Sequence, residues 1–131
     1  MKSFDAKTRY ALMAALDLAE HSASGKPVRI REIAARTGVP PKYLVHILLQ
    51  LKRRALVNST RGAKGGYWLM RPAELISAAE VVGAVASDYR HLSRPLLEVA
   101  YDQAIERLWG EAERRRREFL ARTTLADLLK G

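Results

Sequence analysis

The stretch "IREIAARTGVPPKYLVHIL" (residues 30–48) has the pattern of two short helices joined by a tight turn. Ala34 is small enough to lie where two helices cross, and Gly38, four residues later, supplies the turn. Leu44 and Ile47 follow at helical spacing and would point back onto the first helix. This pattern predicts a helix-turn-helix, in which the second helix enters the major groove of DNA.

Both helices have recognisable ends. The first is expected over residues 31–37, because Gly38 readily adopts the left-handed conformation that closes a helix. The second is expected to begin at the "PP" of residues 40–41, since proline is tolerated in a first helical turn, and to run to about Arg54.

The outward face of this second helix is the candidate reading surface. If its apolar stripe faces inward, the outward side chains are Lys42, Tyr43, His46 and Gln50. Lys52, Arg53 and Arg54 gather near its C-terminal end. Lysine and arginine can hold phosphates, and His46 and Gln50 can form hydrogen bonds with base edges. Any one of these residues, taken alone, is as well explained by an ordinary solvated helix face.

A second segment, "TRGAKGGYWL" (residues 60–69), places Arg61 and Lys64 among three glycines. β-Forming residues flank it, and glycine allows the positive φ of a tight hairpin tip. After a helix-turn-helix, such a hairpin predicts a wing, with Lys64 on a phosphate and Arg61 in a narrow minor groove. A merely solvated turn is the alternative.

The remainder of the chain is predicted to be mainly helical. Helices are expected over residues 5–21, with Asp5 as N-cap, and over 77–86 and 95–122, while "VRI" (28–30) could be a short strand. The predicted fold is therefore mainly α with a small two- to three-stranded β wing. The expected domains are a winged helix-turn-helix at 1–86, a linker at 87–94, and a long dimerisation helix with a C-terminal tail at 95–131.

The long helix carries an apolar stripe close to a 3.5-residue repeat. Its members are Leu97, Tyr101, Ala104, Leu108, Ala112 and Phe119. A stripe of this length is too long for one small domain to cover, so we expect it to pair with the same helix of a second copy in a homodimer.

The charge distribution indicates a polyanionic partner. The net charge of the 131 residues is +9, with +10 in residues 1–72 and −1 in residues 73–131. Double-stranded DNA is the expected partner, because the basic half also holds the helix-turn-helix and the glycine-rich tip. No apolar run reaches the roughly 18 residues of a membrane-spanning helix, so we expect no membrane partner and a cytoplasmic location.

Several kinds of site are disfavoured. The chain has no cysteine, which removes thiolate metal sites and cysteine-ligated iron–sulfur clusters, and its three histidines lack ligand spacing, so no cofactor or metal is expected. We find no phosphate-binding loop, no HExxH and no nucleophile elbow, so we expect no enzyme. The run "RRRR" (114–117) lies among glutamates and is expected to form a salt-bridged helix face rather than a phosphate patch.

Three stretches carry a family likeness: "KTRYALMAALDLA" (7–19), "IREIAARTGVPPKYLVHILLQLKRRALVNSTRGAKGGYWLMRP" (30–72) and "FLARTTLADLL" (119–129). They resemble the Rrf2 family of bacterial winged-helix transcriptional regulators over almost the whole chain, most strongly at "VNSTRGAKGGYWL" (57–69). The resemblance implies a homodimeric repressor or activator. It also implies that Lys42, Tyr43, His46 and Arg61 contact DNA, and that Gly62, Gly65 and Gly66 shape the wing.

Two departures from the family pattern stand out. Many relatives hold an iron–sulfur cluster on three cysteines in the region of residues 88–103, where this chain has none and is expected to be cluster-free. Relatives commonly have Tyr-Leu-Glu-Gln where this chain has "YLVH" (43–46), so their operators need not apply.

Two questions stay open on the sequence alone. The first is whether His91, in the expected linker, has a ligand- or pH-sensing role or is a solvated loop residue, the effector itself being an unknown small molecule or protein. The second is a rival function: a winged-helix module that regulates through a partner protein and no longer reads DNA. Such a module would have no reason to keep the basic helix and tip.

Overall fold

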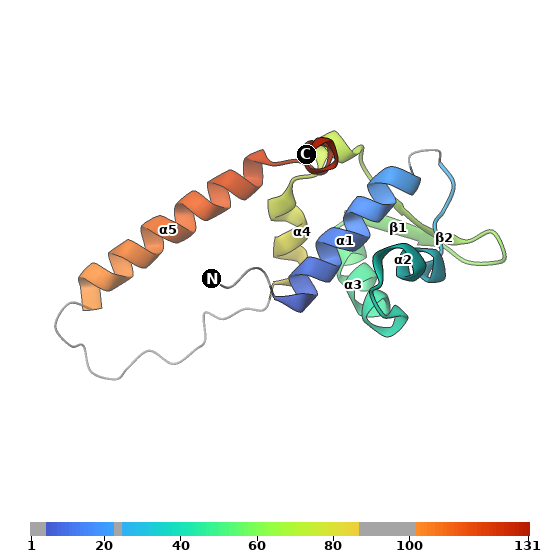
Figure 1. The fold of residues 1–131 in the computed structure, drawn as a ribbon, viewed down its shortest axis with the longest axis horizontal. Coiled ribbons are helices and arrows are strands. Elements are labelled where there is room, and N and C mark those ends of the chain that lie inside the picture. Colours follow the sequence, from blue (N-terminus) through green and yellow to red (C-terminus); the bar gives the residue numbers. More distant parts are fainter. Residues whose placement is uncertain (1–4, 23–24, 87–101) are drawn as a thin grey trace.

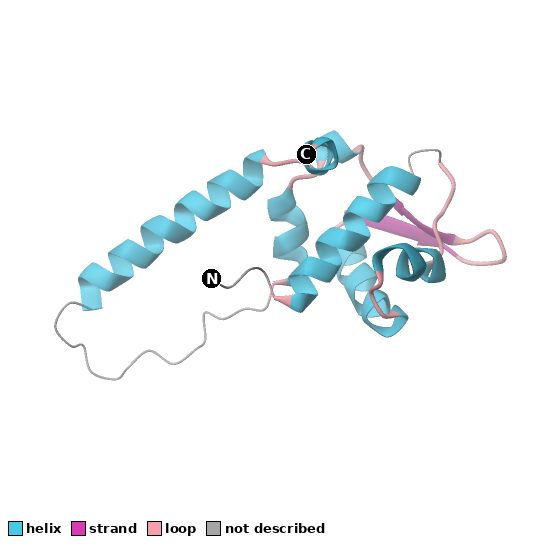
Figure 2. Cartoon of the chain, viewed as in Figure 1, coloured by secondary structure: helices cyan, strands magenta, loops and turns pink. Residues whose placement is uncertain are grey.

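The computed structural model describes residues 5–22, 25–86 and 102–131. The described residues are mainly helical, with one two-stranded antiparallel sheet, as predicted (Figures 1 and 2). The elements in chain order are α1 (Ala6–His21), α2 (Ile30–Thr37), α3 (Pro41–Arg53), β1 (Val57–Thr60), β2 (Gly66–Leu69), the 3₁₀ helix η1 (Ala73–Leu75), α4 (Ala78–Val85), α5 (Asp102–Arg122) and α6 (Leu125–Lys130). All of these except α5 pack around one core, and we call them the head.

Helix α1 is the centre of the head. It begins as predicted at the N-cap Asp5, whose carboxylate accepts a hydrogen bond of 2.8 Å from the Thr8 backbone N–H. Ala11, Ala14 and Leu18 are fully buried along it. Because these side chains are mostly small, α2, α3, α4, α6 and β2 all pack closely against this one helix.

Helices α2 and α3 form the predicted helix-turn-helix. Gly38 closes α2 with φ 79°, and its N–H donates to the Ala34 carbonyl at 2.8 Å. Leu44 and Ile47 point into the core as the apolar spacing predicts. The core side of α3 is therefore occupied, and its opposite side is left to solvent.

The strands β1 and β2 pair with Val57 opposite Leu69 and Thr60 opposite Gly66. The strand suggested at residues 28–30 is reduced to a single bridge between Val28 and Tyr67, with both backbone hydrogen bonds at 2.8 Å. The prediction was too long because α2 already begins at Ile30. We use the term wing for residues 57–69.

The C-terminal residues return to the head. The sequence pattern suggested only a tail after the long helix, but α6 packs against α1 and η1, and Leu125 is fully buried in the core. The Leu125 N–H donates to the Ile76 carbonyl at 3.0 Å, and the Ala78 N–H donates to the Thr123 carbonyl at 2.7 Å. Two backbone hydrogen bonds therefore join the start of α6 to the start of α4.

Helix α5 extends away from the head, and its C-terminal end lies near α4 and α6 (Figure 1). It confirms the predicted long helix over Asp102–Arg122, while residues 95–101 of that prediction lie outside the described part of the chain. Within the described residues, no helix is long and apolar enough to cross a membrane.

Candidate nucleic-acid interface

The solvent face of α3 brings Lys42, Tyr43 and His46 together. All three side chains are exposed, and the Tyr43 ring contacts Tyr10 and Lys42. Its ring centroid is 5.9 Å from that of Tyr10 on α1, and the Lys42 ammonium lies 5.2 Å from the Tyr43 centroid. This cation–π contact and the ring pair hold the start of the α3 face in a defined conformation.

Gln50 departs from the expected outward position. It is only half-buried, yet its Oε1 atom is shielded from solvent and has no hydrogen-bond partner among the described residues. Because α3 packs against α1, α2, α4 and β1, its free face is narrower than the apolar stripe alone indicates. Arg53, at the last residue of α3, is exposed.

Two exposed apolar residues of α3 were missed by the sequence reasoning. Val45 is 49% exposed and Leu49 is 44% exposed, on the solvent side of the helix. Their spacing of four residues, beside the stripe of Leu44, Ile47 and Leu51, is the signal that could have revealed them. Apolar side chains on a base-reading surface can contact the C5-methyl group of thymine.

The wing presents its two cations freely. Arg61 and Lys64 are exposed and form no ion pair with a described residue. The Gly65 N–H donates to the Gly62 carbonyl at 2.9 Å, which closes the tip. The tip is therefore a tight turn with two free cations.

Three glycines are needed by the geometry of the wing. Gly62 has φ 105° and Gly66 has φ 153°, conformations that side chains disfavour. A Cβ on Gly66 would lie 2.6 Å from the Val28 carbonyl oxygen, and a Cβ on Gly65 would overlap the Thr60 carbonyl oxygen. Glycine at 65 and 66 therefore lets the wing backbone approach its neighbours closely.

Helix α3 and the wing form one connected surface. The Lys52 ammonium donates a hydrogen bond of 2.9 Å to the Ser59 hydroxyl on β1. Lys52 thus links the C-terminal turn of α3 to the wing. Arg54 remains exposed just after the helix.

Other cations of the head are held by carboxylates. The Arg36 guanidinium donates two hydrogen bonds to the buried Asp17 carboxylate, at 2.8 and 3.0 Å, and this pairing raises the pKa of Arg36. Arg71 donates to the Glu80 carboxylate at 2.9 Å and to the Leu75 carbonyl at 3.0 Å. Arg36 and Arg71 therefore stabilise the head and add little to the free positive charge.

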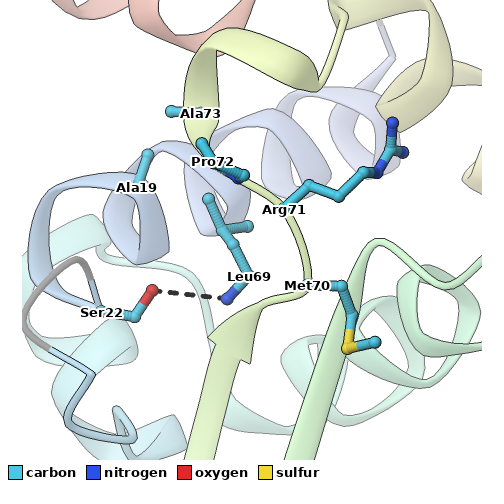
Figure 3. Close-up of a pocket in the computed structure, with 7 residues that line it drawn as sticks. All are labelled: Ala19, Ser22, Leu69, Met70, Arg71, Pro72 and Ala73. Atoms are coloured by element: carbon cyan, nitrogen blue, oxygen red, sulfur yellow. Dashed lines mark hydrogen bonds between the residues drawn. The ribbon is translucent and has the colours of Figure 1, made fainter.

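A cleft of about 230 Å³ lies between α1 and the segment after β2 (Figure 3). Its one charged residue, Arg71, directs its guanidinium out of the cleft toward Glu80. The Ser22 hydroxyl donates to the Leu18 carbonyl at 2.6 Å and accepts from the Leu69 N–H at 3.4 Å. This cleft is a packing junction.

Among the described residues, no cluster of histidine, aspartate and glutamate could hold a metal ion.

Helix α5 carries an uncovered apolar face. Of the residues expected to pair there, Ala104, Leu108, Ala112 and Phe119 are exposed, and Leu97 and Tyr101 lie outside the described residues. The sequence reasoning missed two further members of this face, Ile105 at 61% and Trp109 at 68% exposure. His91 and the expected linker also lie outside the described residues.

Helix α5 also carries a network of ion pairs. Arg114 pairs with Glu111 and Glu118, Arg115 also pairs with Glu111, and Arg116 pairs with Glu113. The hydrogen bonds from Arg114 and Arg115 lower the pKa of Glu111. The prediction of a salt-bridged helix face is confirmed for these three arginines.

Comparisons with known proteins agree with this arrangement. Residues 4–131 match the family model described as "Rrf2: Iron-dependent Transcriptional regulator". The HTH-type transcriptional regulator IscR of Xenorhabdus nematophila is 35% identical over 128 residues, which are 95% of this chain and 77% of that protein.

Solved structures show the same fold. IscR of T. potens superposes with a TM-score of 0.80 at 29% identity, covering 98% of this chain and 87% of that one. CymR, the global cysteine regulator of B. subtilis, superposes with a TM-score of 0.77 at 28% identity, covering 98% and 96%.

Proposed function

This chain belongs to the Rrf2 family of transcriptional regulators, and we propose that it binds operator DNA as a homodimer, through α3 and the wing and without an iron–sulfur cluster. It is a DNA-binding regulator and not an enzyme. We propose that it acts in the cytoplasm, where the bacterial chromosome lies.

The observation that carries this proposal is the set of exposed basic side chains on α3 and the wing, two elements that are joined to each other. Lys42 and His46 on α3 and Arg61 and Lys64 on the wing are all exposed, and the Lys52–Ser59 hydrogen bond joins the two elements. The free charge on this surface gives affinity for phosphates, whatever the base sequence. A module that binds only proteins would have no use for it.

Each residue has a role that fits its chemistry. Lys42, Arg53 and Lys64 are charges for phosphates, and Gly62, Gly65 and Gly66 give the wing its shape. His46 and Tyr43 reach base edges in the major groove, and Gln50 contributes through its amide nitrogen, because its oxygen is enclosed. Arg61 enters the flanking minor groove, where its planar side chain senses groove width.

The proposed homodimer is supported by the apolar face of α5. Ile105, Leu108, Trp109, Ala112 and Phe119 share one side of the helix and are exposed. The same face on a second copy covers them in an isologous contact, and Leu97 and Tyr101 extend the stripe in the sequence. Two heads then engage successive major grooves, and we propose repression as the outcome.

The residues do not fit the cysteine-ligated iron–sulfur cluster that many members of the family hold. None of the 131 residues is cysteine, so no thiolate is present to ligate iron. We expect the protein purified without oxygen to show no sulfide-to-iron absorption bands and no stoichiometric iron. Such bands would overturn the cluster-free proposal without affecting the DNA-binding one.

The DNA proposal is tested in two steps. Selection from a random duplex pool identifies an operator, and Arg61→Ala, His46→Ala and Lys64→Ala are then titrated on operator and scrambled duplexes at several salt concentrations. Arg61→Ala should cost about 1–3 kcal/mol per half-site on the operator and less on scrambled DNA. His46→Ala should relax preference at one base position with little change in salt dependence.

Lys64→Ala should weaken binding to both duplexes alike and reduce the salt dependence by about one ion per site. If Arg61→Ala and His46→Ala bind both duplexes as the wild-type protein does, the wing is a solvated turn and the reading surface lies elsewhere.

A further inference from the structure

An open groove of about 540 Å³ lies between the start of α2 and the wing. Arg29 and Arg31 line it on the α2 side, and Thr60, Gly62 and Ala63 line it on the wing side. Neither arginine was singled out by the sequence pattern, because both precede the helix-turn-helix spacing that drew attention to α3. The groove is a separate surface from the exposed face of α3.

The groove carries positive charge that no carboxylate offsets. No acidic residue lines it, and Arg31 is exposed without an ion pair to any described residue. Glu32 is the nearest acid in sequence, but its carboxylate accepts from the Arg29 backbone N–H at 3.3 Å and lies 4.0 Å from the Arg36 guanidinium. The groove is therefore suited to an anion.

The two walls of the groove are fixed relative to each other. Val28 and Tyr67 exchange backbone hydrogen bonds of 2.8 Å in both directions, directly before the two arginines. Gly66 packs so closely on Val28 that a Cβ there would lie 2.6 to 2.8 Å from three backbone atoms of Val28. The arginines are thus held at a set distance from the wing, and the groove exists before any ligand binds.

The groove continues the proposed DNA surface. Pro41, the first residue of α3, lines its floor, and Lys42 and Arg61 are the sequence neighbours of Pro41 and Thr60. A duplex that contacts α3 and the wing together must therefore carry one backbone strand past this groove.

We propose that Arg29 and Arg31 hold phosphates of the DNA backbone in this groove, and so set the register of α3 in the major groove. This inference rests on the proposed function. Contacts to phosphate position a protein without reading bases, so these arginines contribute equally on every sequence. Their forked guanidinium groups match phosphate oxygens in pairs, which lysine does not reproduce.

The test is a salt titration with a labelled 30-base-pair duplex of random sequence and with a selected operator. The double variant Arg29→Gln/Arg31→Gln should bind both duplexes more weakly by the same factor. Its plot of log affinity against log salt should be shallower by about two ions per protomer. Arg29→Lys/Arg31→Lys should restore most of the slope, and Arg31→Gln alone should remove about one ion per protomer.

The matched control is Arg107→Gln/Arg117→Gln, which removes two exposed positive charges from the polar side of α5. It should bind as the wild-type protein does, and the unfolding midpoint of each variant shows that it is folded. Two results would overturn the proposal that this groove binds phosphates: a wild-type salt slope in the Arg29/Arg31 double variant, or an equal loss of affinity in the control variant. Either result would leave the proposed function intact. A wild-type protein that binds neither duplex would overturn both.

Discussion

The Arg36 guanidinium on α2 donates hydrogen bonds of 2.8 and 3.0 Å to the two carboxylate oxygens of Asp17 on α1. The two residues are 19 positions apart in the sequence. The Asp17 side chain is only 6% exposed, whereas that of Arg36 is 34% exposed. The pair sets the position of α2 on α1, and α2 in turn carries one wall of the groove beside the wing.

Breaking this pair should destabilise the head. Arg36→Ala should lower the free energy of unfolding by about 2–3 kcal/mol, because it leaves the buried Asp17 carboxylate without this partner. Asp17→Ala should cost less, because the Arg36 side chain that it leaves is partly exposed to solvent. The double variant should lose clearly less than the sum of the two. Urea denaturation of the four proteins measures this coupling, and strictly additive losses would show that the pair contributes nothing of its own.

Gly66→Ala should disrupt the wing. The added methyl group meets the Val28 backbone, and φ 153° disfavours any side chain, so the loss should exceed about 2 kcal/mol and DNA affinity should fall with it. Gly83→Ala on α4 is the control. Its Cβ meets nothing within 4 Å, so the variant should gain up to about 1 kcal/mol from helix propensity. Equal thermal midpoints for the two variants would contradict the close packing at Gly66.

Acid should weaken the start of α4. The pKa of Glu80 is lowered from 4.5, chiefly because its carboxylate accepts a hydrogen bond from the Ser77 N–H and also bonds to Arg71. A lowered folded-state pKa means that this stabilisation is complete above pH 4.5 and is lost as the pH falls through the folded-state value. Glu80→Gln should therefore be less stable than wild type at pH 7 and converge with it as the pH falls below the folded-state pKa of Glu80. Urea midpoints across this range check the prediction, and a constant difference at all pH values would refute it.

Leu108→Glu should produce a monomer. Leu108 is 71% exposed on the apolar face of α5, and a carboxylate there would be buried at the proposed pairing surface. Gln103→Glu adds the same charge at another exposed position of the helix and should remain dimeric. Light scattering gives the mass of each protein, and circular dichroism confirms that both are folded. A wild-type protein that scatters as a 14.7 kDa monomer would end the dimer proposal.

The helix-turn-helix could be predicted because its signals are local. Gly38 closes α2, and the buried Leu44 and Ile47 follow at the periodicity of one helix. The same holds for the wing, whose glycines are required by its own turn and by a close neighbour. Residues a few positions apart carry all of this information.

The features that the sequence did not reveal depend on contacts between distant segments. Asp17 lies among the apolar residues of α1, and only the folded chain brings Arg36 to it. Leu125 belongs to a helix of six residues, too short for periodicity to detect, and its burial depends on α1 and η1. Gln50 faces away from the core by spacing, but the crowding of elements around α3 encloses its oxygen.

The joining of α6 to α4 has a consequence for biosynthesis. A ribosome releases Ser77 long before Thr124, yet these two residues pair, and Leu125 completes the core that α1 begins. The nascent head must therefore wait, with an open apolar site beside α1 and η1, until the whole of α5 has emerged. Residues 125–130 therefore complete the head last, although they pack against its first helix.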